Sequence, residues 1–210
     1  MKHEKPDTKI SPKVIERLIM YRRLLLNING ENGGYIFSRD LADLANNTPE
    51  QTRRDLMLTG YFGSPQKGYD VKNLTKSIEK TIQSGRQIRV ALAGLGNLGK
   101  AILSNFKSYH PELVVEAVFD IDASKIASPV MGISSFHVDR MTEVVREKNV
   151  RIGILTVPAG AAQETADRMI AAGITGILNF APVPIKVPEG VFVDGIDITL
   201  MLEKIAFFSR

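Results

Sequence analysis

The 210-residue sequence contains no cysteine, only three histidines and no long apolar run. Without cysteine the chain can form no disulfide, thiolate nucleophile or thiol redox switch, so any redox sensing must come from a bound cofactor. The histidines His3, His110 and His137 are scattered and do not have metal-ligand spacing. No stretch approaches the roughly 18 apolar residues of a membrane span, and the polar N-terminus lacks a signal-peptide core. We therefore expect a cytoplasmic protein without a metal site.

The composition is that of an ordinary folded protein, with 44% hydrophobic and 24% charged residues, and the length suits two small domains. Charge is unevenly distributed: residues 1–90 hold 16 Lys and Arg against 10 Asp and Glu, whereas residues 91–210 hold 11 against 13. A basic excess alone is usually a solvated surface, so nucleic-acid binding requires a motif as well.

The N-terminal half supplies a helix-turn-helix pattern. Ser11-Pro12 predicts the start of an amphipathic helix of about five turns. Its apolar residues recur at three-to-four spacing at Val14, Ile15, Leu18, Ile19, Leu25 and Leu26. After a loop at 29–34, Ser38 is expected to cap a short helix over 39–45. A turn at Asn46-Asn47 then leads to a second helix, which begins at Thr48-Pro49 and runs through Leu58.

The second helix has the character of a DNA recognition helix. Its first half carries Gln51, Thr52, Arg53 and Arg54, where such a helix presents side chains to the major groove, while Leu56 and Leu58 are expected to face inward. The glycine-bounded segment 61–69 suits a wing that touches phosphate or the minor groove, with Ser64 and Lys67 as its candidate contacts. The alternative for the two arginines is salt bridging on the helix surface, with Glu50 or Asp55.

A dinucleotide-binding pattern follows. The strand Ile88-Arg-Val-Ala-Leu-Ala runs into Gly94-Leu95-Gly96-Asn97-Leu98-Gly99, and a second strand over 113–119 ends at Asp120. The first glycine makes the tight turn, the second lets backbone approach a pyrophosphate, and the third lets the helix pack on the strand. A carboxylate at Asp120 would bind the adenosine ribose and repel the extra phosphate of NADP, which favours NAD(H). Two alternatives stay open: Asp120 or Asp122 caps the next turn, and Lys125 softens the discrimination.

The order of these segments resembles the Rex family of redox-sensing transcriptional repressors of bacteria over nearly the whole chain. The motifs that carry the resemblance are Gln51-Thr-Arg-Arg-Asp-Leu56, Lys67-Gly-Tyr-Asp70-Val, Gly94-Leu-Gly-Asn-Leu-Gly99, Phe119-Asp-Ile-Asp122, Leu155-Thr-Val-Pro-Ala159 and Gly176-Ile-Leu-Asn-Phe-Ala-Pro182. The family is a homodimer whose winged helices bind a palindromic operator and whose Rossmann domains bind NAD(H), and NADH releases the DNA. The resemblance implies an α/β chain: a winged helix-turn-helix domain over 1–84, a Rossmann parallel-sheet domain over 85–196 and a domain-swapped C-terminal helix over 197–210.

The resemblance also assigns residues. It implies DNA contacts for Arg53, Arg54 and Lys67, a pyrophosphate loop over Gly94–Gly99 and a ribose acid at Asp120. Two strand-end loops would border the nicotinamide half, with Thr156, Val157, Pro158 and Phe180 as candidates, although Val157 and Phe180 can equally be core residues. The family's switch salt bridge between subunits matches Arg23 and Asp197. One departure is Asn105, which stands where the family commonly has a tyrosine that moves on cofactor exchange.

Two other functions use a similar glycine loop. A dehydrogenase would need a substrate domain, for which about 110 residues leave no room, and neither His137 nor Lys186 has a paired acid at a recognisable spacing. A CoA-binding Rossmann module shares the loop and the Val157-Pro158-Ala159 turn but would not need a basic winged helix. We therefore expect a non-enzymatic repressor whose partners are operator DNA, NADH and NAD+, and a second copy of itself.

Overall fold

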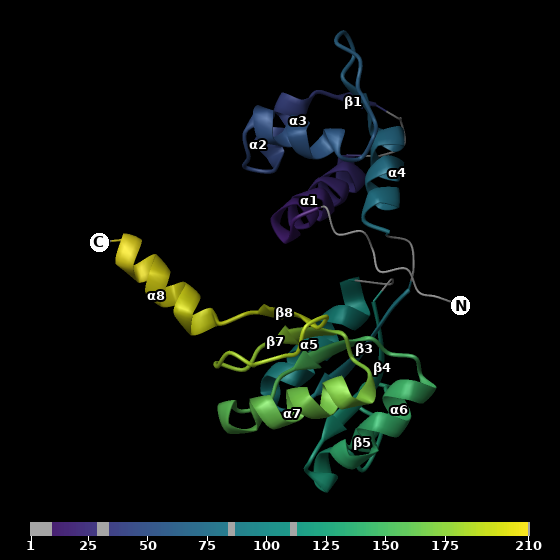
Figure 1. The fold of residues 1–210 in the computed structure, drawn as a ribbon, viewed down its shortest axis with the longest axis vertical. Coiled ribbons are helices and arrows are strands. Elements are labelled where there is room, and N and C mark those ends of the chain that lie inside the picture. Colours follow the sequence, from purple (N-terminus) through teal and green to yellow (C-terminus); the bar gives the residue numbers. More distant parts are fainter. Residues whose placement is uncertain (1–9, 29–33, 84–86, 110–112, 210) are drawn as a thin grey trace. The chain divides into compact units, whose positions relative to one another are not determined.

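A computed structural model describes residues 10–28, 34–83, 87–109 and 113–209 of the chain. The chain divides into two compact units, Met1–Arg86 and Gln87–Arg210 (Figure 1). Most of the expected loop at 29–34, together with His3 and His110, lies outside the described residues. Within the described part, no helix is long and apolar enough to cross a membrane.

The N-terminal unit is a winged helix-turn-helix. Its elements are α1 (Pro12–Ile28), β1 (Tyr35–Ile36), α2 (Ser38–Leu44), α3 (Pro49–Met57), β2 (Tyr69–Asp70) and α4 (Val71–Thr81). Helix α1 contacts α2, α3 and α4, and the core between them is closed by Leu18, Tyr21, Leu25, Leu41, Leu56, Leu74 and Ile78, all 0% exposed. The predicted domain type is confirmed.

The turn between α2 and α3 forms as the sequence predicts. Asn46 adopts a left-handed conformation with φ of 50°, which asparagine tolerates better than most residues. Thr48 caps α3 by accepting a hydrogen bond from the Gln51 N–H at 3.2 Å, and Pro49 occupies the first turn. The wing follows α3: Ser64 and Gly68 form an antiparallel bridge, and β2 pairs with β1.

Three local predictions in this unit are wrong. Ser38 is the first residue of α2 instead of its cap, and Phe37 stands at the cap position without a side-chain bond. Leu58 follows the end of α3 and is 53% exposed instead of facing inward. Ile19 and Leu26 of the predicted apolar face of α1 are exposed. The buried face of this helix instead includes Tyr21, which was not among the apolar residues of the predicted pattern.

The C-terminal unit contains a six-stranded parallel sheet in the order β5-β4-β3-β6-β7-β8. The strands are β3 (Ile88–Ala93), β4 (Leu113–Asp120), β5 (Ser135–His137), β6 (Ile152–Leu155), β7 (Gly176–Asn179) and β8 (Phe192–Gly195). The helices are α5 (Asn97–Tyr109), α6 (Met141–Glu147), α7 (Ala159–Ala172) and α8 (Ile198–Phe208), with short 3-10 turns η1 (Ala123–Lys125) and η2 (Val138–Arg140). This strand order is that of a doubly wound Rossmann sheet, whose direction of winding reverses between β3 and β6.

Alternate residues of the central strands belong to two different hydrophobic clusters. Val90 and Leu92 pack with Leu103 of α5, whereas Ala91 and Ala93 pack in a cluster that contains residues of α6 and α7. Side chains of a strand alternate between the faces of a sheet, so helices cover both faces here. The predicted Rossmann architecture is therefore confirmed.

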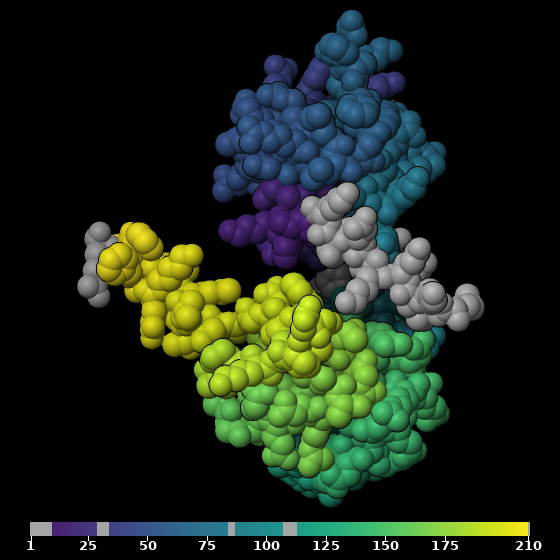
Figure 2. All heavy atoms as spheres, viewed as in Figure 1, coloured from purple at the N-terminus to yellow at the C-terminus, as the bar shows by residue number. Residues whose placement is uncertain are grey.

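Helix α8 carries exposed apolar side chains. Ile198, Met201, Leu202, Ile205 and Phe208 are each at least 49% exposed, and no residue of α8 is buried. Figure 2 shows the atoms of this helix in yellow at the surface of the chain.

Candidate functional site

The turn after β3 requires glycine at its first and third positions. Gly94 has φ of +104°, and a Cβ built on it would lie 2.5 Å from the Thr156 carbonyl oxygen. A Cβ on Gly99 would collide with the Gly94 carbonyl oxygen. The turn therefore closes tightly on both β3 and β6, and α5 packs directly against it.

The middle glycine is different, because a Cβ on Gly96 would meet no atom within 4 Å. Gly96, Asn97 and Leu98 are exposed while Leu95 is buried, so the turn presents one open side. Helix α5 starts at Asn97, and the backbone N–H groups at a helix N-terminus attract phosphate groups. The open space over Gly96 is the room that an approaching pyrophosphate needs.

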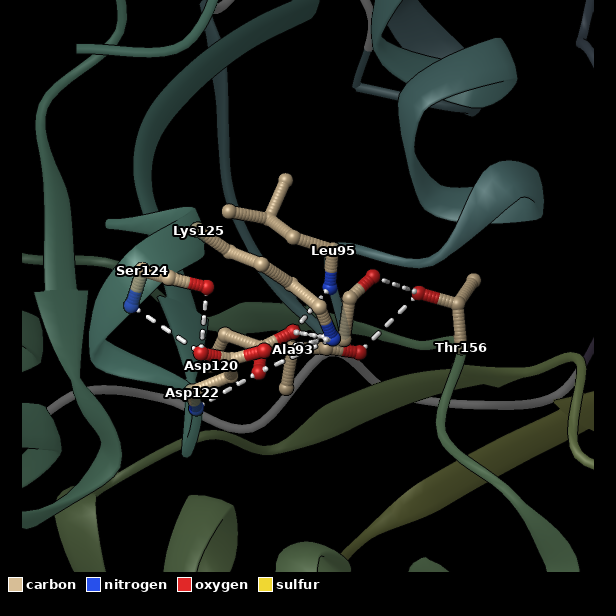
Figure 3. A network of polar contacts seen from close by, with 8 residues as sticks. Ala93, Leu95, Asp120, Asp122, Ser124, Lys125 and Thr156 are labelled. Carbon is tan, nitrogen blue, oxygen red and sulfur yellow. Dashed lines mark hydrogen bonds and ion pairs between the residues drawn. The ribbon is translucent and has the colours of Figure 1, made fainter. Parts of the chain in front are cut away.

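Asp120 lies at the end of β4 and connects that strand to the glycine turn (Figure 3). Its side chain is 6% exposed. One oxygen accepts a hydrogen bond from the Leu95 N–H at 2.7 Å, and the other accepts from the Asp122 N–H at 2.9 Å. Lys125 Nζ lies 3.4 Å from both oxygens. The carboxylate therefore stands beside the turn with a cation next to it.

Asp122 performs the capping role that had been left open between the two aspartates. Its Oδ1 accepts hydrogen bonds from the Ser124 hydroxyl at 2.6 Å and from the Ser124 N–H at 2.9 Å. These bonds, with the side-chain bond the larger cause, lower the pKa of Asp122. Asp120 makes the equivalent bond to the Asp122 N–H, so both aspartates hold the turn after β4.

The third contribution to this edge comes from β6. The Thr156 hydroxyl is within donating distance of two carbonyl oxygens, that of Gly94 at 2.8 Å and that of Ala93 at 3.0 Å (Figure 3). Val157 and Phe180 are half-buried and pack against the two hydrophobic clusters, whereas Pro158 is exposed at the start of α7. Because β3, β4, β6 and β7 are parallel, these residues follow strands that end at one edge of the sheet.

His137 has an acidic neighbour that the sequence did not indicate. Its Nδ1 lies 3.1 Å from Asp139 Oδ2, and Asp139 also pairs with Arg168 at 3.0 Å. The expectation that this histidine lacks a paired acid is wrong. However, His137 ends β5, which is the edge strand beside β4 and two strands away from β3.

On α3, Arg53 and Arg54 are exposed. The predicted alternative is also present, because Arg53 Nη2 lies 3.1 Å from Glu50 Oε1. Both partners are at least half exposed, so this pair is weak and can open. Thr52, by contrast, is fully buried and is not available for outside contacts.

The remaining candidates on this unit already have contacts within it. The Gln51 side-chain amide donates to Asp55 Oδ1 at 2.9 Å. Ser64 Oγ accepts from the Lys67 N–H at 3.0 Å and so shapes the wing turn. Lys67 is exposed, with Nζ 5.6 Å from the centre of the Tyr35 ring. Among the predicted DNA contacts of this unit, the exposed basic residues are therefore Arg53, Arg54 and Lys67.

The predicted switch residues lie on α1 and at the N-terminal cap of α8. On α1, Arg22 pairs with Glu79 of α4 at 3.0 Å, whereas Arg23 is exposed. Asp197 caps α8 by accepting from the Leu200 N–H at 3.0 Å. Asn105 is exposed on α5.

Arg17 and Asp55 form an ion pair that the sequence patterns did not single out. Arg17 donates two hydrogen bonds to the Asp55 carboxylate, at 2.6 and 2.8 Å, and that carboxylate is 1% exposed. A usable signal existed: Arg17 and Tyr21 are four residues apart on the face of α1 that carries Leu18 and Leu25. A charge next to an apolar stripe calls for a buried partner.

Comparison with known proteins places both units in one family. The family described as putative DNA-binding protein N-terminus matches residues 9–56, and the family described as CoA binding domain matches residues 85–183. The chain is 38% identical over 200 residues to the redox-sensing transcriptional repressor Rex of Desulfitobacterium hafniense, and 37% identical to that of Syntrophobacter fumaroxidans. The alignments cover 95% of each chain.

Solved structures agree with these relatives. The crystal structure of RSP in complex with β-NAD+ and operator DNA has a TM-score of 0.88 at 30% identity and covers 96% of this chain and 93% of that one. The complex of RSP with β-NADH has a TM-score of 0.82 at 29% identity and covers 96% and 95%. RSP is a Rex-family repressor. On the strength of relatives that match from end to end, the chain belongs to the Rex family of redox-sensing transcriptional repressors.

Proposed function

We propose that this protein is a repressor that binds palindromic operator DNA as a homodimer and leaves it when NADH binds its Rossmann domain. The observation that carries the proposal is the pairing, on one chain, of an open glycine turn beside Asp120 with a winged helix that exposes Arg53 and Arg54. RSP binds both NAD+ and operator DNA, and its structure matches this chain over 96% of its length.

On the DNA side, α3 is the recognition helix and the segment 61–69 is the wing. Arginine can bind a guanine edge through two hydrogen bonds, which gives Arg53 and Arg54 the role of reading bases. Lys67 in the wing approaches the backbone or the minor groove. Gln51 and Ser64 are already hydrogen-bonded within the unit, so they support the shape of α3 and of the wing beside the DNA-contacting residues.

On the cofactor side, the residues fit NAD(H). The turn Gly94–Gly99 and the start of α5 hold the pyrophosphate over Gly96, while Asp120 accepts hydrogen bonds from the adenosine ribose. The carboxylate at Asp120 favours NAD(H) over NADP, and Lys125 beside it reduces that preference. Thr156 and Pro158 border the nicotinamide half, and Val157 and Phe180 support its walls from the hydrophobic clusters.

The switch and the dimer rest on α1 and α8. We assign Arg23 and Asp197 to a salt bridge between subunits, because Arg22 is already paired with Glu79 and Arg23 is exposed. Such a pair is sensitive to geometry, so a small rotation of the subunits breaks it and biases the dimer between two states. The exposed apolar side chains of α8 support an exchange of residues 197–210 between subunits, after domains over 1–84 and 85–196.

The protein acts as a sensor without catalysing a reaction. NADH supplies a signal here, and hydride transfer would require an acid or base beside the nicotinamide half. His137 and Asp139 lie at β5, on the Asp120 side of the sheet, which is the adenosine side. A repressor acts where the operator DNA lies, which for a bacterium is the cytoplasm.

The direct test is DNA binding with each candidate ligand. A palindromic duplex enriched by the protein from a random DNA library is bound in a gel shift, and NADH, NAD+ or CoA is then added. We expect release by NADH and not by CoA. Failure to enrich any palindrome at low salt refutes the proposed repressor function. Release by CoA alone would identify a CoA-binding module. That module is the second candidate because the family described as CoA binding domain matches residues 85–183.

A further inference from the structure

The carboxylate of Asp55 is enclosed by hydrogen-bond donors from two helices. Its Oδ2 accepts from Arg17 Nε at 2.6 Å and from the Tyr21 hydroxyl at 3.1 Å. Its Oδ1 accepts from Arg17 Nη2 at 2.8 Å and from Gln51 Nε2 at 2.9 Å. Each carboxylate oxygen therefore has two donors, and the arginine binds in the planar two-point arrangement that fixes direction as well as distance.

The same contacts extend into the turn before α3. The Tyr21 hydroxyl accepts from Asn47 Nδ2 at 2.7 Å and lies 3.2 Å from the hydroxyl of Thr52. Thr52 and Asp55 are buried, and Tyr21 is 0% exposed. One face of α1, the turn and the inner face of α3 are thus joined by polar contacts instead of apolar packing alone.

Direction matters here because Asp55 comes directly after Arg53 and Arg54. Successive residues of an α-helix point about 100° apart, so a fixed direction for Asp55 fixes the direction in which both arginines leave the helix. Burial of Leu56 determines which face of α3 points toward the core, but apolar burial has no preferred direction and so limits the rotation less narrowly than a two-point polar contact does. A two-point ion pair does have one.

We propose that Arg17 and Asp55 are positioning residues that set the rotation of α3 about its axis and thereby determine how well the protein distinguishes its operator from other DNA. This inference rests on the proposed function, since it assigns the two residues a part in reading DNA. Buried ion pairs often contribute little net stability, and well-packed apolar residues could replace them for folding alone. The ion pair therefore acts mainly by fixing the orientation of α3.

The variants Asp55→Asn and Arg17→Gln test the proposal in the full chain. Each removes the ion pair, while the exposed arginines of α3 stay in place. Glu79→Gln is the matched control, because it breaks the 3.0 Å ion pair of Arg22 between α1 and α4, in the same domain but away from α3. Dissociation constants are measured by fluorescence anisotropy for the enriched palindrome and for a scrambled duplex of equal length and composition, at one salt concentration.

We expect both variants to lose discrimination by at least about tenfold, comparable to the loss of one good base contact. Binding to scrambled DNA, which depends on total charge, changes much less. Partial unfolding would weaken binding to both duplexes by the same factor, so the ratio of the two constants separates orientation from stability. Glu79→Gln is expected to keep the wild-type ratio.

A ratio within about twofold of wild type in Arg17→Gln, with the far-ultraviolet circular dichroism spectrum unchanged, overturns the proposal. If Asp55→Asn fails to fold, Arg17→Gln alone decides the question. Arg17 is the better tolerated site, because its side chain is 29% exposed and Asp55 keeps the hydrogen bonds from Tyr21 and Gln51 without it. A wild-type protein that does not distinguish the palindrome from scrambled DNA contradicts the proposed function instead.

Discussion

Replacing Arg53 by alanine should weaken operator binding strongly while leaving the fold intact. Its ion pair with Glu50 joins side chains that are 50% and 65% exposed, and exposed pairs of this kind contribute at most about 1 kcal/mol to stability. A bidentate contact to a guanine contributes about 1–3 kcal/mol to discrimination. With one Arg53 in each subunit of the proposed homodimer, the loss is about 2–6 kcal/mol, or roughly 30-fold to 2 × 10⁴-fold in the dissociation constant.

The assay is fluorescence anisotropy with the labelled palindrome, with NADH binding followed separately by the fluorescence of NADH. Arg53→Ala should keep the NADH affinity of the wild type, because Arg53 belongs to the N-terminal unit and the glycine turn to the other. Glu50→Ala is the matched control: it breaks the same ion pair from the other side and removes a negative charge, so operator binding should stay equal or become tighter. Normal operator binding by Arg53→Ala would refute the assignment of α3 to the groove and leave surface pairing as the only role of Arg53.

Four further outcomes follow from the structure. Gly96→Val should fold, since its Cβ meets no atom within 4 Å, but lose NADH affinity by more than about tenfold and repress whatever the NADH concentration; calorimetry with NADH checks this. Burial works to raise the pKa of Asp55, but its hydrogen bonds outweigh burial and lower that pKa, so the unfolded chain binds the proton more readily. The free energy of unfolding, measured with urea, should therefore fall as the pH drops below about 4, and it should fall less steeply in Asp55→Asn than in the wild type. Ile205→Asp should yield folded monomers in sedimentation, because Ile205 is 60% exposed in its own chain, whereas Lys204→Ala should stay dimeric. Asn105→Tyr, which supplies the family's aromatic side chain, should lower the NADH concentration that releases DNA; an unchanged midpoint would show that Asn105 does not limit the response.

Patterns with a short range in sequence predicted most of the architecture. The glycine spacing, the strand before it and Asp120 after the next strand specify a Rossmann turn, because each residue type meets a local steric or hydrogen-bonding need. Thr48-Pro49 specified the start of α3 for the same reason. Ser38 failed as a cap because capping depends on backbone conformation at the helix end, which the chain assigned to Phe37.

The features of the site that could not be predicted depend on contacts between residues far apart in the sequence. Asp55 is 38 residues from Arg17, so although Arg17 beside an apolar stripe calls for a buried partner, no local pattern identifies Asp55 as that partner. Thr52 was grouped with its neighbours on the outer face of α3, but it is buried beside Tyr21. Lys125 pairs with Asp120 from only five residues away, and the sequence alone predicts that it softens the discrimination between NAD and NADP.

Operator binding is expected to report the balance of NADH and NAD+. The most direct measurement follows operator occupancy by anisotropy while the NADH to NAD+ ratio is raised at a constant total concentration. Occupancy should be high when NAD+ dominates and should fall as the ratio rises, with no such fall in Gly96→Val. Occupancy that stays constant across the whole ratio, with the wild-type protein bound to its operator, would contradict this expectation.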